Sequence, residues 1–150
     1  MAGTYTDIQL HFVFSTKRRA AFITPELRPR LYEYLGGIVR RADAVLYQIG
    51  GALDHVHPLV RWRQDLRIQD FLRELKSASS GWVHKTFPHL RAFAWQKGYG
   101  AFSVSHSQSD RVKRYIAGQE DHHRRRDFNQ EFIGLLRRHE IEYDEERIWD

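Results

Sequence analysis

Two histidines that flank a valine are the residues best suited to chemistry in this sequence. They lie in Asp54-His55-Val56-His57, within a stretch that has strand character. Because successive side chains of a strand point to opposite faces, His55 and His57 share one face and lie roughly 7 Å apart along the strand. Neutral imidazole is the commonest protein ligand for metal ions, and a strand fixes the spacing of two ligands. The pattern therefore indicates a candidate metal site, although strand histidines also occur simply packed against a sheet.

A tyrosine and a glutamine lie on one face of a helix further along the chain. Val112, Tyr115, Ile116 and Gln119 have the spacing i, i+3, i+4 and i+7 within a helix expected over about 108–122. Tyr115 alone would be an ordinary core residue, but a buried amide without a partner costs on the order of 1–3 kcal/mol. Gln119 therefore indicates that something polar faces this helix.

Strands and amphipathic helices must position these residues. The first strand is expected over 5–14, where His11 has the parity of Gln9 and so shares the face of the His pair if the two strands are neighbours. Asp127 followed by Gln130 predicts a capping box at the start of the last helix. Further strands are expected over 44–53, 55–62 and 93–105, and helices over 24–43, 68–85, 108–122 and from 127.

The composition limits the classes of protein that fit. The chain has 150 residues and no cysteine, which excludes disulfides, cysteine-based zinc sites and thiol nucleophiles. No apolar stretch approaches the length of a membrane span, and we expect a cytoplasmic protein. The net charge is +5, and the excess of Lys and Arg is concentrated in the middle of the chain, from Arg61 to Arg126. This distribution is a physical argument for a polyanionic partner such as nucleic acid, with a solvated basic surface as the common alternative. The candidate nucleic-acid contacts are Lys17, Arg18, Arg19, Arg73, Lys76, Arg111 and Arg114.

Five short motifs, in order along the chain, carry a resemblance to a known family. They are His11-Phe12-Val13-Phe14-Ser15-Thr16-Lys17, Asp54-His55-Val56-His57, Arg73-Glu74-Leu75-Lys76, Trp95-Gln96-Lys97-Gly98-Tyr99-Gly100 and Tyr115-Ile116-Ala117-Gly118-Gln119-Glu120. As a set they resemble the single-tyrosine transposases of the IS200/IS605 type, including the REP-associated relatives, which belong to the HUH endonucleases. The resemblance runs from about Tyr5 to His123.

The resemblance implies a role for each matched residue. His55 and His57 correspond to the two HUH metal ligands, Gln119 to the third ligand and Tyr115 to the nucleophile. In the family a divalent ion, Mg²⁺ or Mn²⁺, polarises a phosphate of single-stranded DNA at hairpin-bearing ends. The tyrosine attacks phosphorus without ATP, which gives a 5′-phosphotyrosyl link and a free 3′-OH. Because the pKa of free tyrosine is near 10, such a nucleophile needs a metal or cationic groups nearby.

The expected fold is a single α/β (α+β) domain over 1–150, with a C-terminal helix and tail from about 127. Its sheet should be ferredoxin-like or RRM-like and mainly antiparallel, with helices on one face and the His pair on the other. The expected partners are single-stranded DNA with hairpins and a second copy of the chain. By resemblance, such homodimers can exchange their tyrosine helices.

Several features leave alternatives open. Pro58 directly follows the His pair, and proline in a central strand removes a ladder hydrogen bond, so the strand is expected to kink or to lie at an edge. His122 and His123 are candidates for a metal ligand, a DNA contact or a solvated surface position, and the solvated surface is the favoured expectation. Tyr99 is a weaker candidate for the nucleophile. The alternative functions are a domesticated REP-type nuclease that processes palindromes, a module that binds structured single-stranded nucleic acid without cutting it, and a protein with a purely structural metal site.

Overall fold

A four-stranded sheet forms the centre of the computed structural model, which describes residues 3–123 and 126–148. The strands are β1 (Gln9–Ser15), β2 (Val45–Gly51), β3 (His55–Arg61) and β4 (Gly100–Val104). Their order in the sheet is β2-β3-β1-β4, and each neighbouring pair is antiparallel. The expected ferredoxin-like, antiparallel α+β fold is confirmed.

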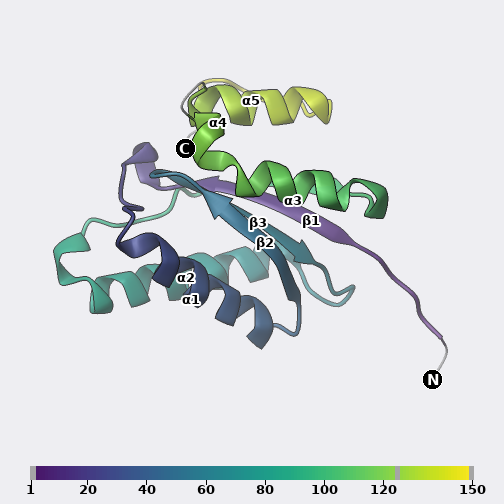
Figure 1. Ribbon diagram of the computed structural model, residues 1–150, viewed down its shortest axis with the longest axis horizontal. Helices are drawn as coiled ribbons and strands as arrows, with labels where there is room; N and C mark the ends of the chain where they lie inside the picture. The colour runs from purple at the N-terminus through teal and green to yellow at the C-terminus, as the bar shows by residue number, and fades with distance from the viewer. Residues whose placement is uncertain (1–2, 124–125, 149–150) are drawn as a thin grey trace.

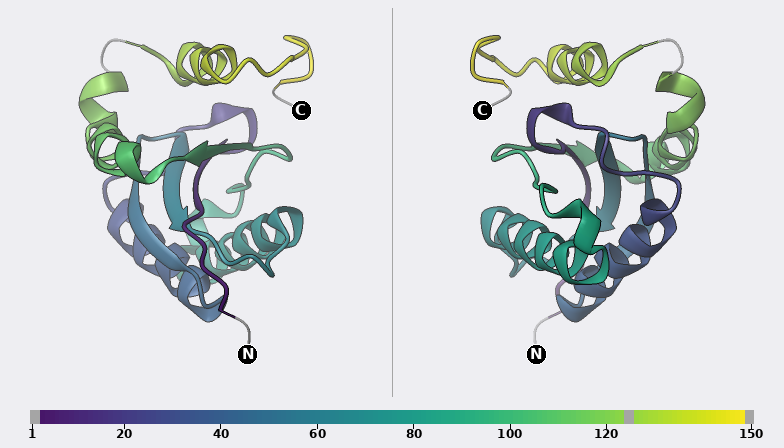
Figure 2. Two further views of the ribbon diagram at one scale, coloured as in Figure 1. Left: turned by 90° about the vertical axis from the view of Figure 1, so that its right-hand side faces the viewer. Right: turned by 90° about the vertical axis from the view of Figure 1, so that its left-hand side faces the viewer.

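Helices lie over both faces of this sheet (Figures 1 and 2). The α-helices are α1 (Leu27–Arg41), α2 (Ile68–Thr86), α3 (Ser109–Ala117), α4 (Gln119–His123) and α5 (Phe128–Arg138), and three short 3-10 turns are η1 (Lys17–Arg19), η2 (Pro88–Leu90) and η3 (His106–Gln108). The first two α-helices cover one face, as expected. The chain then crosses to the opposite face, where α3, α4 and α5 cover the side that was expected to carry only the His pair. Among the described residues, no helix is long and apolar enough to cross a membrane.

The alternation of side chains along β1 separates two cores. Phe12 and Phe14 are fully buried in the larger core beneath the sheet, together with Val56 of β3. His11 and Val13 point to the opposite face, and Val13 belongs to the smaller core. The parity predicted for His11 is confirmed, because β1 and β3 are direct neighbours.

The smaller core holds α5 against β1 and β4. It consists of Val13, Phe102, Phe128, Phe132, Leu135 and Leu136. The predicted capping box is present, since the Asp127 carboxylate accepts from the Gln130 amide N–H at 2.8 Å and the Gln130 side chain accepts from the Asp127 N–H at 3.2 Å. Tyr143 and Ile148 of the C-terminal tail pack against this core, whereas Trp149, the next residue of the tail, lies outside the described residues.

Pro58 lies in a central strand, so the expectation of an edge position is wrong. It pairs with Ile49 of β2, close to a register shift between Leu46 and Gln48. On its other side β3 pairs with β1, where Leu59 pairs with His11 and Val56 pairs with Phe14. Pro58, between these two pairs, has no assigned partner in β1. Proline is tolerated in sheets at such irregularities because no ladder bond requires its missing N–H.

The predicted helix over 108–122 is interrupted. The first segment, α3, ends at Ala117, and Gly118 has φ −91° and ψ 16° before α4 begins at Gln119. The first segment packs on β2 at Gly50, where an added Cβ would lie 2.2 Å from the Ile116 carbonyl oxygen. This glycine lets the helix backbone approach the sheet edge and so fixes the position of Tyr115.

Candidate active site

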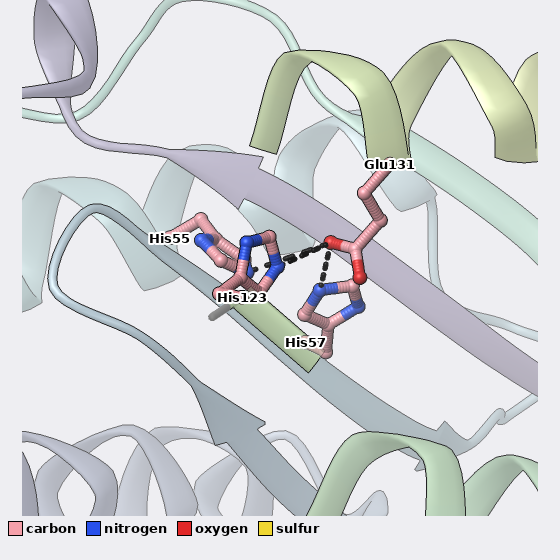
Figure 3. A group of neighbouring side chains, drawn as sticks. All are labelled: His55, His57, His123 and Glu131. Atoms are coloured by element: carbon pink, nitrogen blue, oxygen red, sulfur yellow. Dashed lines mark hydrogen bonds and ion pairs between the residues drawn. The ribbon is translucent and has the colours of Figure 1, made fainter. Parts of the chain in front are cut away.

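Three imidazoles and one carboxylate converge on the sheet face beneath α4 and α5 (Figure 3). His55 and His57 come from β3, His123 ends α4, and Glu131 lies in α5. One potential ligand atom from each of the four side chains lies within 4.8 Å of the other three. Bonds of roughly 2.0–2.2 Å to a single ion place its ligand atoms about 3–4.4 Å apart. The largest separation in the cluster lies just above this range, so the four atoms are close to the spacing that one metal ion needs.

The Glu131 carboxylate lies at the centre of this cluster. Its side chain is 1% exposed, and Oε1 lies 2.9 Å from His57 Nε2, 3.1 Å from His123 Nε2 and 3.5 Å from His55 Nε2. Burial by itself would raise the pKa of Glu131, but the hydrogen bonds with His123 and His57 outweigh it and hold the pKa well below its usual range. This carboxylate is therefore ionised and available to a cation.

The Tyr115 hydroxyl donates a hydrogen bond to Oε2 of the same carboxylate. Burial raises the pKa of Tyr115, and the nearby Glu131 charge raises it further. In this environment the tyrosine is a neutral phenol at physiological pH. A nucleophilic role consequently requires positive charge beside its oxygen.

His55 is held in an orientation that suits a metal ligand. Its Nδ1 lies 2.8 Å from an Asp54 carboxylate oxygen, and its Nε2 lies 3.0 Å from Gln119 Oε1. In the tautomer whose Nδ1–H donates to Asp54, the Nε2 lone pair of His55 faces the oxygens of Gln119 and Glu131. Three electron-pair donors then converge without a proton between them, which is the electrostatic requirement of a cation site. The donor set thus fits the divalent ion expected from the sequence.

His57 is held by another histidine. Its Nδ1 lies 2.8 Å from His11 Nε2, and the two rings stack with centroids 5.0 Å apart. Burial lowers the pKa of His57 to about 4, although the contact with Glu131 opposes this shift, and burial also lowers the pKa of His11. Both imidazoles are therefore neutral near pH 7, the form in which imidazole binds metals.

Two members of the cluster were not found from the sequence. His123 was expected at the solvated surface, but its side chain is only 10% exposed and faces Glu131, so that expectation is wrong. His122 is 28% exposed and also lies near this carboxylate, with Nε2 3.3 Å from Oε2. Glu131 interrupts the apolar stripe of α5 between Phe128 and Leu135, which is the one sequence signal that points to a buried, partnered acid.

The basic residues considered for nucleic-acid binding are scattered over the surface. Lys17, Arg18 and Arg19 form η1, and Arg19 lines a cavity of about 490 Å³ that also reaches His123. Lys76 does not present a free ammonium, because its Nζ donates to the Gln96 and Gly98 carbonyls at 2.9 and 2.7 Å. Its role as a phosphate contact is thus less well supported than its role in holding the 96–98 turn.

The remaining basic candidates lie on α2 and α3. Arg73 is exposed on α2 and lines a cavity of about 570 Å³, and Arg114 is exposed on α3. Arg111 lines a cavity of about 550 Å³ that includes Tyr115. Of these three arginines, Arg111 is the one that shares a cavity with the candidate nucleophile.

The cavity beside Tyr115 has both apolar and cationic walls. Its lining includes His11, Phe102, Arg111, Arg138 and His139. Aromatic rings provide stacking surfaces for bases, and arginines provide charge for phosphates. It is therefore the approach to the tyrosine best suited to a single strand of nucleic acid.

A family model described as "Transposase IS200 like" matches residues 4–119, which includes the His pair, Tyr115 and Gln119. The chain belongs to the IS200-like transposase family. Members of this family act on DNA, and the resemblance found from the sequence motifs is confirmed. The matched segment ends at Gln119, so the two further cluster members, His123 and Glu131, lie beyond it.

Known transposases support this membership. The ISDra2 transposase TnpA of Deinococcus radiodurans is 24% identical over 124 residues, which cover 79% of this chain and 89% of that protein. A crystal structure of a Deinococcus radiodurans R1 protein described as a transposase is 26% identical, with a TM-score of 0.67 and coverage of 79% of this chain and 95% of that one.

A REP-associated tyrosine transposase bound to a REP hairpin has the same fold. Its TM-score is 0.57, its sequence is 16% identical, and the match covers 79% of this chain and 70% of that one.

Proposed function

We propose that this transposase cuts and rejoins single-stranded DNA through a covalent bond to Tyr115. The observation that carries the proposal is the contact of the Tyr115 hydroxyl with Glu131, whose other oxygen lies among the histidines. A nucleophile and a compact set of metal-binding groups thus meet on one carboxylate. A purely structural metal site would not need a tyrosine hydroxyl beside it.

The proposed chemistry is a transesterification at phosphorus. The Tyr115 oxygen forms a bond to phosphorus as the bond from phosphorus to the 3′ oxygen breaks, which leaves a 5′-phosphotyrosyl link and a free 3′-OH. The proton lost by the phenol is balanced, through solvent, by the proton that the 3′ oxygen gains. Joining is the reverse attack by a 3′-OH, so the energy of the phosphodiester bond is conserved and ATP is not needed.

His55, His57 and Gln119 are the ligands proposed from the family motifs for a divalent ion, Mg²⁺ or Mn²⁺. When bound, such an ion withdraws charge from the phosphoryl oxygens and stabilises the charge that develops in the attack. Asp54 and His11 keep the two β3 imidazoles in fixed orientations. Arg111 and Arg138, which line the cavity beside Tyr115, are proposed to contact phosphates that flank the reacting one.

Hairpin-bearing DNA is the proposed substrate. A relative of the same fold is bound to a REP hairpin, and the cationic, aromatic cavity beside Tyr115 suits an unpaired strand next to such a hairpin. One chain can supply the whole site, because Gln119 contacts His55 and the Tyr115 ring packs against His57 within the same chain. The expected dimer is therefore proposed to serve DNA binding, with each tyrosine acting in its own subunit.

The test is the capture of a labelled single strand. Incubation of the protein with 5′- and 3′-labelled hairpin oligonucleotides and Mn²⁺ should give a denaturation-resistant adduct that carries only the label 3′ of the cut. Tyr115→Phe should abolish it because the nucleophilic oxygen is removed. Tyr99→Phe is the matched control and should form the adduct normally, since Tyr99 lies beside Lys76, outside the cluster.

Mixing two inactive variants tests the subunit arrangement. Tyr115→Phe and His57→Ala proteins, refolded together, should remain inactive if each site is built from one chain. Recovery of the adduct in the mixture would contradict this arrangement, and an adduct formed by Tyr115→Phe alone would contradict the choice of nucleophile.

A further inference from the structure

A buried glutamate lies where the family motifs supply no ligand. Glu131 is in α5, beyond the segment that matches the family model, and its side chain is 1% exposed. The described residues place three imidazole nitrogens within 3.5 Å of its Oε1, and no lysine or arginine forms an ion pair with it among those that the structure describes. Such a carboxylate has the charge and the neighbours of a metal ligand.

We propose that Glu131 and His123 bind the catalytic ion directly, together with His55 and His57. The proposal rests on the proposed function and adds to it a carboxylate and an imidazole from the α4–α5 region. A ligand set with one negative charge holds a divalent ion more tightly than imidazoles and a neutral amide alone, because the carboxylate attraction is not screened by water at a buried position. Three imidazoles favour transition-metal ions over Mg²⁺, which prefers oxygen ligands and water.

The fold holds this ligand on a rigid element. Phe128, Phe132, Leu135 and Leu136 fix α5 against the sheet, and the Asp127–Gln130 capping box fixes its first turn. Glu131 lies in the first turn of α5, and its carboxylate points toward His55 and His57 of β3 (Figure 3). The position of the carboxylate is therefore set before an ion arrives, which lowers the cost of ordering it on binding.

The same carboxylate also contacts the nucleophile. Oε1 faces the imidazoles while Oε2 accepts from the Tyr115 hydroxyl. A metal ion bound by the imidazoles and Oε1 would therefore be separated from the Tyr115 oxygen only by the Glu131 carboxylate. In this arrangement α5, and not only the tyrosine helix, sets the distance between the ion and the nucleophile.

The test measures metal binding without DNA and without cleavage. Titration of the full chain with Mn²⁺, with free Mn²⁺ followed by electron paramagnetic resonance, gives the dissociation constant. Glu131→Gln, which keeps the size of the side chain and removes its charge, should weaken Mn²⁺ binding by at least the roughly 10–100-fold seen when the surroundings of a metal ligand are altered. Glu142→Gln, the same change at an exposed position, should leave it unchanged.

His123 has its own readout. Nitrogen couplings in the pulsed spectrum of bound Mn²⁺ should indicate three imidazoles in the wild type and two in His123→Ala. Glu131→Asp keeps the negative charge but withdraws it by one methylene, so it should weaken Mn²⁺ binding even if Glu131→Gln does not fold. Circular dichroism establishes which variants are folded.

Wild-type affinity in folded Glu131→Gln or Glu131→Asp protein, or unchanged nitrogen couplings in His123→Ala, would overturn the proposal. Absence of Mn²⁺ binding to the wild type would overturn it as well. These outcomes are distinguishable from a failure of the proposed function, which is read from the Tyr115 adduct.

Discussion

The two imidazoles of β3 are each oriented by a different neighbour. Asp54 contacts Nδ1 of His55, and His11 contacts Nδ1 of His57, so in both rings Nε2 faces the centre of the cluster. Partners of this kind fix the tautomer and the ring plane of a metal-binding histidine. Asp54 is part of the sequence motif, whereas His11 reaches His57 only because β1 lies beside β3.

Removal of the Asp54 carboxylate should weaken metal binding without unfolding the protein. Asp54→Ala leaves His55 free to take the other tautomer, and Mn²⁺ affinity should fall roughly 10–100-fold. Asp110→Ala removes an exposed carboxylate elsewhere and should change nothing. Equal Mn²⁺ dissociation constants for the two variants, measured by calorimetry, would show that His55 does not need this contact.

Of the four cluster residues, the sequence led us to expect His55 and His57 together. The His55-Val56-His57 spacing correctly predicted a shared face, and the helical spacing correctly predicted that Gln119 meets a polar group. His123 was only a less favoured candidate ligand, and Glu131 was not expected in the cluster, because the path of α5 over the sheet depends on the packing of its apolar stripe. The roles of these residues as ligands stay predictions.

The elements that carry the site are α3, α4 and α5, and their placement depends on a few close contacts. Ile116, which follows the tyrosine, is fully buried and lies against Gly50 of β2. The break at Gly118 then redirects the chain so that Gln119 and His123 also reach the His pair. An uninterrupted helix was expected from the periodicity, since a one-residue break leaves the local pattern almost unchanged.

A single methyl group at Gly50 should displace the tyrosine helix. In Gly50→Ala the new Cβ would lie 2.2 Å from the Ile116 carbonyl oxygen, so α3 must move. We expect a loss of roughly 1–3 kcal/mol in the free energy of unfolding and a large loss of the Tyr115 adduct.

A matched substitution is available in α2. Gly81 has nothing within 4 Å of an added Cβ, and Gly81→Ala should stabilise the protein by roughly 0.5–1 kcal/mol through its higher helix propensity. Thermal and denaturant unfolding provide the stabilities. A Gly50→Ala protein as stable and active as the wild type would show that α3 is not held by this contact.

Over the whole molecule, the net charge of +5 favours DNA, but the basic residues lie on different elements of the fold. Arg111 shares a cavity with Tyr115, whereas Arg41 ends α1 beneath the other face of the sheet. The sequence predicted an excess of cations in the middle of the chain. It could not predict which of them face the nucleophile, because that depends on the crossing of α3 over the sheet.

Arg111 should contribute more to DNA binding than an arginine on the opposite side. Arg111→Ala should weaken binding of a single strand and reduce the slope of log affinity against log salt by about 0.7, the value for one phosphate contact. Arg41→Ala makes the same change in net charge and should preserve the slope. Fluorescence anisotropy over a range of salt concentrations distinguishes the two, and equal slopes would contradict the assigned DNA path.

Glu131 follows Tyr115 in the chain, so a ribosome completes the nucleophile before the carboxylate that contacts it. A nascent chain that stops short of α5 contains the His pair and the tyrosine, yet it lacks the acidic ligand proposed to hold the ion beside them. Strand cleavage would then begin only when translation of α5 is finished and the helix has docked.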